Sequence, residues 1–149
     1  MSVKLRMAGH LIRRLHQVST HIFTQRMREA GFDLTPVQFA ALESLRHNPG
    51  TDQAGLAQAV AKDRATIGAV VDRLEQKGLI ARSVSQRDKR ARVLALTEQG
   101  QNTIAAVLPV VEALQRDMLP GLSDAEYAQF IALASKAAEA AETLDTGAG

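Results

Sequence analysis

The segment SQRDKRA, residues 85–91, carries the most readily interpreted chemistry in the chain. It places three cations, Arg87, Lys89 and Arg90, around a single carboxylate, Asp88. Short aliphatic runs precede and follow it, so we predict that it is the tip of a β-hairpin. Guanidinium and ammonium groups bind phosphates, and arginine is also attracted into a narrow DNA minor groove. A solvated charged hairpin is the simpler alternative.

The segment before this hairpin, residues 64–77, is predicted to be a helix with two unlike faces. Its apolar positions follow one face of a 3.6-residue period: Ile67, Val70, Val71 and Leu74. The opposite face is small or polar: Ala65, Gly68, Ala69, Asp72 and Arg73. Small residues near the start of an exposed helix allow a large partner to approach closely, and such a helix fits a DNA major groove.

Helix and hairpin together supply the candidate residues for DNA contact. On the helix they are Arg64, Thr66, Gly68 and Arg73, and on the hairpin tip Arg87, Asp88, Lys89 and Arg90. The remaining cations of the hairpin, Arg82 and Arg92, are expected to bind phosphates or to pack on the hairpin. For Arg73 a salt bridge near its own helix is the alternative. Periodicity indicates the exposed face but not which side chain reads a base.

The stretch DRATIGAVVDRLEQKGLIARSVSQRDKRARVLALTEQG resembles the core of the MarR family of bacterial transcriptional regulators. This resemblance implies a mostly α-helical fold with a small β-hairpin wing, namely a winged helix-turn-helix plus a helical dimerisation bundle. It also implies that Arg90 inserts into the minor groove and that Asp88 orients it. We therefore expect a homodimer on double-stranded DNA, with its recognition helices about one turn apart on a pseudo-palindromic operator.

The flanking segments are predicted to form the bundle. Long or amphipathic helices are expected at residues 8–30, at 36–47 with Thr35 as cap, after Thr51 or Asp52 to residue 60, at 97–118, and at 123–141. The chain is predicted to be one domain, 1–149. Residues 1–34 and 98–149 would supply dimerisation helices, and residues 35–97 the winged helix-turn-helix.

The distribution of charge agrees with this division. Residues 61–100 hold nine Lys or Arg against five Asp or Glu, whereas residues 101–149 hold two against seven. Positive charge is thus concentrated where DNA contact is predicted. Cysteine is absent, which excludes disulfides, thiolate zinc sites and thiol redox sensing. No apolar run is long enough to span a membrane, so we expect a cytoplasmic protein without membrane contact.

Two further segments, HLIRRLHQVSTHIF and FDLTPVQFAAL, resemble MarR regulators of aromatic-acid breakdown. The resemblance implies a pocket for a small aromatic acid, such as a hydroxybenzoate, a hydroxynicotinate or an aryl-CoA thioester. A carboxylate needs a cationic partner, for which Arg14 is the first candidate and Arg13 the second. His10, His16 and Phe39 would line the pocket. The alternative is that Arg13 and Arg14 are simply solvated.

Other functions have less support in the sequence. The four histidines, His10, His16, His21 and His47, invite a metal-responsive alternative, but His16 and His21 are five residues apart and do not share a helix face. We expect no metal, no cofactor and no catalytic residues, because no nucleophile–base set or phosphate-binding loop is evident. A ligand-independent regulator and a winged-helix protein-interaction module also remain alternatives.

Overall fold

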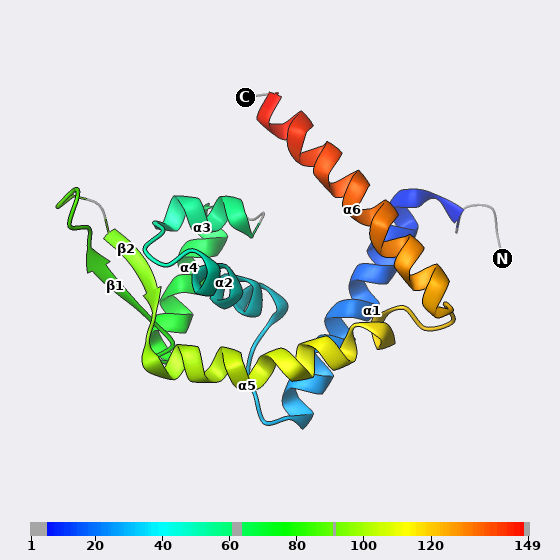
Figure 1. Cartoon of the computed structure of the whole chain (residues 1–149), viewed down its shortest axis with the longest axis horizontal. Coiled ribbons are helices and arrows are strands. Elements are labelled where there is room, and N and C mark those ends of the chain that lie inside the picture. Colours follow the sequence, from blue (N-terminus) through cyan, green and yellow to red (C-terminus); the bar gives the residue numbers. More distant parts are fainter. Residues whose placement is uncertain (1–5, 61–63, 91, 148–149) are drawn as a thin grey trace.

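A computed structural model describes residues 6–60, 64–90 and 92–147 (Figure 1). The elements follow the order α1 (Ala8–Glu29), α2 (Pro36–His47), α3 (Gln53–Ala59), α4 (Arg64–Gln76), β1 (Ile80–Val84), β2 (Arg92–Leu96), α5 (Glu98–Leu114), the 3₁₀ helix η2 (Arg116–Met118) and α6 (Asp124–Gly147). The fold is mostly helical with one antiparallel two-stranded hairpin, as predicted. Among the described residues, no helix combines the length and apolarity needed to cross a bilayer.

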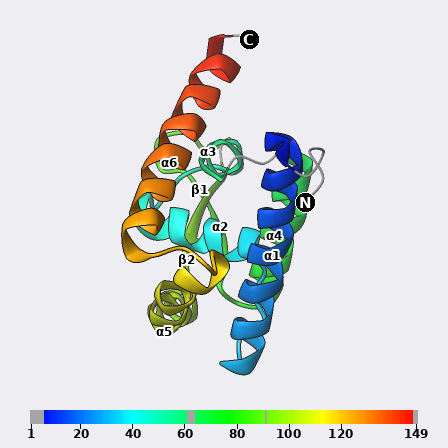
Figure 2. The ribbon, with the colours of Figure 1, turned by 90° about the vertical axis from the view of Figure 1, so that its right-hand side faces the viewer.

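The elements form two regions joined by α5. Figure 1 shows the β-hairpin at one end of the molecule, α1 and α6 at the other, and α5 running between them. In Figure 2 α5 is viewed end-on, and α1 and α6 project as two separate helices. We call α2, α3, α4 and the β-hairpin the winged region, and α1 and α6 the terminal helices. The winged region is compact, whereas the terminal helices extend away from it.

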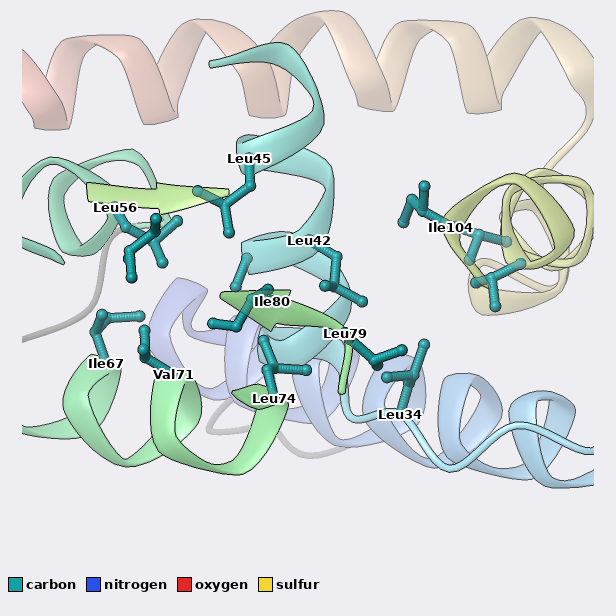
Figure 3. Packing of buried hydrophobic residues seen from close by; sticks show 14 of the residues in the cluster. Leu34, Leu42, Leu45, Leu56, Ile67, Val71, Leu74, Leu79, Ile80 and Ile104 are labelled. Carbon is teal, nitrogen blue, oxygen red and sulfur yellow. The ribbon is translucent and has the colours of Figure 1, made fainter. Parts of the chain in front are cut away.

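The core lies in the winged region, between α2, α3, α4 and the hairpin (Figure 3). Its central side chains are at most 2% exposed: Leu42, Leu45, Leu56, Ile67, Val71, Leu74, Ile80 and Leu94. The predicted stripe of α4 is confirmed, since Ile67, Val71 and Leu74 are fully buried and Val70 packs partly buried against the core. The core continues along α5 and reaches α1 through Phe23 and Met27.

Local capping signals set the helix starts. Thr35 Oγ1 accepts a hydrogen bond from Gln38 N–H, and the Gln38 side chain accepts one from Thr35 N–H, which completes a capping box before Pro36. Of the two possible caps of α3, Asp52 caps the helix by accepting from Gly55 N–H at 2.7 Å. Thr51 instead pairs its backbone with β2.

Two helix ends differ from the sequence prediction. The fifth helix was expected to reach residue 118, but α5 ends at Leu114 and a separate 3₁₀ turn follows. The last helix was expected to end near residue 141, but α6 continues to Gly147. Residues 142–147, ETLDTG, contain no proline and no glycine before Gly147, so no helix-breaking residue interrupts α6 earlier.

Candidate nucleic-acid interface

The hairpin is a short, regular extension of the core. β1 and β2 pair antiparallel from Ile80 opposite Leu96 to Val84 opposite Arg92. At the base of the hairpin, Leu94 N–H donates to Thr51 O at 2.8 Å. These bonds fix the direction in which the tip projects from the winged region.

Side-chain hydrogen bonds shape the backbone of the tip. Ser85 Oγ accepts from the backbone N–H groups of Arg87 and Asp88, and Asp88 Oδ1 accepts from Arg90 N–H at 3.0 Å. The resemblance implied that Asp88 orients Arg90, and the contact in the structure is made to the Arg90 backbone. The cations Arg87, Lys89 and Arg90 are exposed and form no ion pair with any described residue. Their charges are therefore available to an external anion.

The outer face of α4 lies beside this hairpin and is formed by small and polar side chains. Ala65, Thr66, Ala69 and Arg73 are exposed, which agrees with the predicted face. Arg73 forms no ion pair with any described residue, so the alternative salt bridge is not present. The side chain of Arg64 lies outside the described part of the structure.

Gly68 of α4 has a packing role that the sequence did not indicate. It is half-buried, and a Cβ added there would lie 3.1 Å from Nε2 of Gln53 on α3. A larger residue at position 68 would therefore require the end of the Gln53 side chain to move by a few tenths of an ångström. Its predicted contact with DNA remains a prediction.

The side chain of Arg82 on β1 forms ion pairs with α4 instead of pointing to solvent. Its Nη2 lies 2.7 Å from Asp72 Oδ1 and its Nη1 lies 2.9 Å from Glu75 Oε1. The side-chain hydrogen bond with Asp72 is the main reason why the pKa of Arg82 is raised. Carboxylates three residues apart on one helix share a face, but their spacing does not indicate which residue of another element pairs with them.

The residues at the C-terminal end of α4 form hydrogen bonds with neighbouring elements. Lys77 Nζ donates to the Asp33 carbonyl oxygen and to Gln38 Oε1, and the latter contact is 3.1 Å long. Thr97, the cap of α5, donates its hydroxyl to Gly78 O at 2.6 Å. A Cβ added to Gly100 would lie 2.0 Å from Leu79 O, so only glycine fits where α5 begins.

The predicted pocket residues lie in two places. His10, Arg13, Arg14 and His16 are on α1, where Arg13, Arg14 and His16 are exposed and His10 is half-buried. Phe39 is on α2 and packs against Phe23, with ring centroids 5.9 Å apart. His16 borders a cavity of about 250 Å³ between α1, η2 and α6, whose wall does not include the other four residues.

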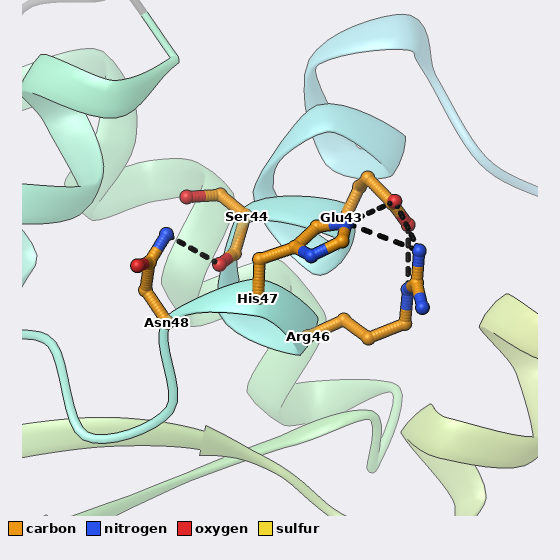
Figure 4. A network of polar contacts seen from close by, with 5 residues as sticks. All are labelled: Glu43, Ser44, Arg46, His47 and Asn48. Carbon is orange, nitrogen blue, oxygen red and sulfur yellow. Dashed lines mark hydrogen bonds and ion pairs between the residues drawn. The ribbon is translucent and has the colours of Figure 1, made fainter.

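A polar cluster at the end of α2, shown in Figure 4, was not predicted. Glu43 accepts from Arg46 Nε at 3.0 Å and Nη2 at 2.6 Å, and Glu43 Oε1 lies 2.9 Å from His47 Nε2. The hydrogen bond from Arg46 is the main reason why the pKa of Glu43 is lowered. The i, i+3 and i, i+4 spacing was visible in the sequence and would have indicated this cluster.

Arg46 also borders a cavity of about 400 Å³ between α2, β2 and α5. Its wall is mostly aliphatic and includes Leu45, Leu96, Ile104 and Leu108. The sequence did not indicate this cavity, because its wall combines residues far apart along the chain. Within the described residues, no group of three or more His, Asp or Glu is arranged to hold a metal ion.

Comparison with known proteins identifies the family. Residues 34–91 match the MarR family profile. The transcriptional regulator HosA of Escherichia coli O157:H7 is 31% identical over 129 residues, which are 87% of this chain and 93% of HosA. Similar solved structures include Bordetella bronchiseptica BpsR, whose DNA binding is regulated by 6-hydroxynicotinic acid (TM-score 0.83, 29% identity, 93% of this chain and 97% of BpsR). The transcriptional repressor CouR, bound to a 23-mer DNA duplex, gives a TM-score of 0.78 at 29% identity over 95% of this chain and 99% of CouR. The chain belongs to the MarR family of DNA-binding transcriptional regulators.

Proposed function

We propose that the protein is a homodimeric repressor that a small aromatic or heteroaromatic carboxylate releases from a pseudo-palindromic operator. The observation that carries this proposal is the surface formed by α4 and the wing. The tip cations Arg87, Lys89 and Arg90 are exposed and have no ion-pair partner among the described residues, and Ala65 and Ala69 are exposed on α4. Such a surface can place a helix in the major groove and cations on the flanking backbone.

Self-association is supported by the terminal helices. They expose large apolar side chains: Leu11 and Ile12 on α1, and Ile131, Leu133 and Leu144 on α6. They also carry opposite charge, because α1 is basic apart from Glu29 whereas α6 is acidic apart from Lys136. A second copy of the chain would cover this apolar surface and pair α1 of one protomer with α6 of the other.

Release by an aromatic acid is supported by the similarity to BpsR, since 6-hydroxynicotinic acid is a heteroaromatic carboxylate. Within this chain we assign Arg14 to the carboxylate and His16, which borders the cavity between α1, η2 and α6, to the ring. If the ligand favours a dimer whose recognition helices are misaligned for the operator, ligand and DNA oppose each other by the same factor. A coupling free energy of about 2 kcal/mol weakens operator binding about thirtyfold.

The Arg14→Ala variant tests this assignment. We expect it to bind the operator as the wild type does, because α1 lies away from the wing in Figure 1. Its release by the acid should be weakened several-fold, measured as the acid concentration that displaces half of the protein. An unchanged acid response would remove Arg14 from the pocket.

The proposed function itself is tested by fluorescence anisotropy. The probe is a labelled duplex from the region upstream of the protein's own gene, compared with a scrambled duplex of equal length. We expect tight binding to the first duplex, steep weakening with salt, and reversal by one member of a panel of hydroxybenzoates and hydroxynicotinates. Binding that no acid reverses would contradict the effector proposal. Equal weak binding to both duplexes would contradict operator recognition and favour a protein-interaction module.

A further inference from the structure

The two edges of the wing are held to the core by different contacts. On the β2 side the contacts are backbone hydrogen bonds, from Gly50 N–H to Leu94 O at 3.1 Å and from Leu94 N–H to Thr51 O at 2.8 Å. On the β1 side, the ion pairs to α4 come from one side chain, that of Arg82. A two-stranded hairpin is marginally stable on its own, so contacts at its base decide where its tip lies.

Arg82 lies where the hairpin leaves the core. Side chains two residues apart on a strand share a face, and Ile80, which shares the face of Arg82, is 2% exposed. The Arg82 side chain is 24% exposed, and each Nη meets a different carboxylate of α4. Ion pairs that form a network around a planar guanidinium hold their partners in a defined geometry, unlike isolated surface pairs.

This arrangement explains two acidic residues that would otherwise oppose DNA binding. Asp72 and Glu75 lie on α4, the helix predicted to enter the major groove, and both side chains are more than 40% exposed. Carboxylates near DNA repel the phosphate backbone. Pairing with Arg82 offsets their charge and uses them to hold the wing.

We propose that Arg82 is a positioning residue for DNA binding, which fixes the wing relative to the recognition helix so that Arg90 and α4 meet one duplex together. This inference rests on the proposed function. It differs from the sequence interpretation, in which Arg82 binds a phosphate or packs on the hairpin. Its guanidinium acts within the protein, through Asp72 and Glu75.

The first test separates positioning from phosphate contact. Arg82→Met keeps the aliphatic stem and removes the ion pairs, and we expect it to bind the upstream duplex about tenfold more weakly. In a background in which Arg87, Lys89 and Arg90 are all replaced by Ala, Arg82→Met should leave the slope of log affinity against log salt unchanged, whereas loss of a direct phosphate contact would flatten it by about 0.9. A flatter slope in that background, or unchanged affinity of the single variant Arg82→Met, would overturn the proposal.

The second test replaces the carboxylates of Asp72 and Glu75. The proposal predicts the opposite change in DNA affinity from the one that charge repulsion alone predicts. The double variant Asp72→Asn with Glu75→Gln removes two negative charges near the DNA, which alone would strengthen binding. Because it also frees Arg82, we expect weaker binding. Tighter binding would overturn the proposal. Since both carboxylate side chains are exposed, this variant should fold even if Arg82→Met does not.

The third test asks whether Arg82 acts through the wing tip. In a double-mutant cycle, the losses caused by Arg82→Met and Arg90→Ala should not add, because a displaced wing no longer delivers Arg90. Arg92→Met, which removes another hairpin cation, is the matched control and should add to Arg90→Ala. Additive losses for Arg82→Met would overturn the inference alone. Absence of operator binding by the wild type would contradict the proposed function instead.

Discussion

The winged region and the terminal helices bury their apolar residues to very different extents. In the winged region the central aliphatic side chains are at most 2% exposed, whereas on α6 the side chains of Ile131, Leu133 and Leu144 are 43%, 60% and 74% exposed. One chain is thus sufficient to close the core around α4. The terminal helices keep exposed apolar surface, which the proposed self-association would cover.

The largest expected effect is in the winged core. Leu42→Ala removes a fully buried side chain of α2 and should lower the free energy of unfolding by about 2–5 kcal/mol, measured by urea denaturation. Val84→Ala, at a wing position that is 54% exposed, is the control and should change stability by less than about 0.5 kcal/mol. Equal losses would contradict the contrast in packing.

The next effect concerns the exposed terminal helices. Leu133→Lys places a cation where the basic α1 of a second protomer is proposed to pack, so it should weaken self-association at least about thirtyfold in sedimentation experiments. Stability of the winged core should not change. Leu133→Met preserves apolar volume and should remain dimeric. A Lys variant as dimeric as the wild type would remove Leu133 from the interface.

A smaller effect is expected at the wing tip. Arg90→Ala should weaken operator binding by about tenfold and leave the dimer intact, because the side chain is exposed and forms no ion pair with any described residue. Anisotropy measures the affinity and size-exclusion chromatography the dimer. Unchanged affinity would remove Arg90 from the DNA contact set.

The smallest effect is the pH dependence of the cluster at the end of α2. The pKa of Glu43 is lowered in the folded protein, chiefly by the hydrogen bond from Arg46. The stabilisation is therefore present above the pKa of the unfolded state and is lost as pH falls through the folded pKa. The free energy of unfolding falls between neutral and acidic pH, and in Glu43→Gln this fall should be smaller than in the wild type by less than about 1 kcal/mol. Thermal melts across this pH range measure the difference. If the variant lost as much stability at acidic pH as the wild type does, a stabilising role for Glu43 would be contradicted.

The sequence predicted those features that depend on neighbours along the chain. The stripe Ile67, Val71 and Leu74 defined the buried face of α4, and the Thr35 capping box set the start of α2. The hairpin was recognisable because its charged tip lies between two short aliphatic runs. Periodicity and capping act within one or two turns, so they can be read without knowing the fold.

Features made by distant residues were not predicted. The fork of Arg82 onto Asp72 and Glu75 depends on how β1 crosses α4, and Arg82 was interpreted only as a cation for phosphate or for packing on the hairpin. The cavity beside Arg46 needs α2, β2 and α5 to meet. The packing of Gly68 against Gln53 likewise depends on the angle between α3 and α4. The amino-acid sequence alone does not show how these helices and strands are placed relative to one another.

The tight junction around Gly100 has a consequence for how motion crosses the molecule. α5 holds 17 residues and starts where Thr97 and Gly100 contact Gly78 and Leu79, which directly follow α4. At about 1.5 Å per residue, α5 spans about 25 Å, so a tilt of about 8° at one end shifts the other by about 3.5 Å. That shift is close to the roughly 3.4 Å between successive base pairs. A rotation of about 8° at the far end of α5 would therefore displace its winged end by about the height of one base-pair step.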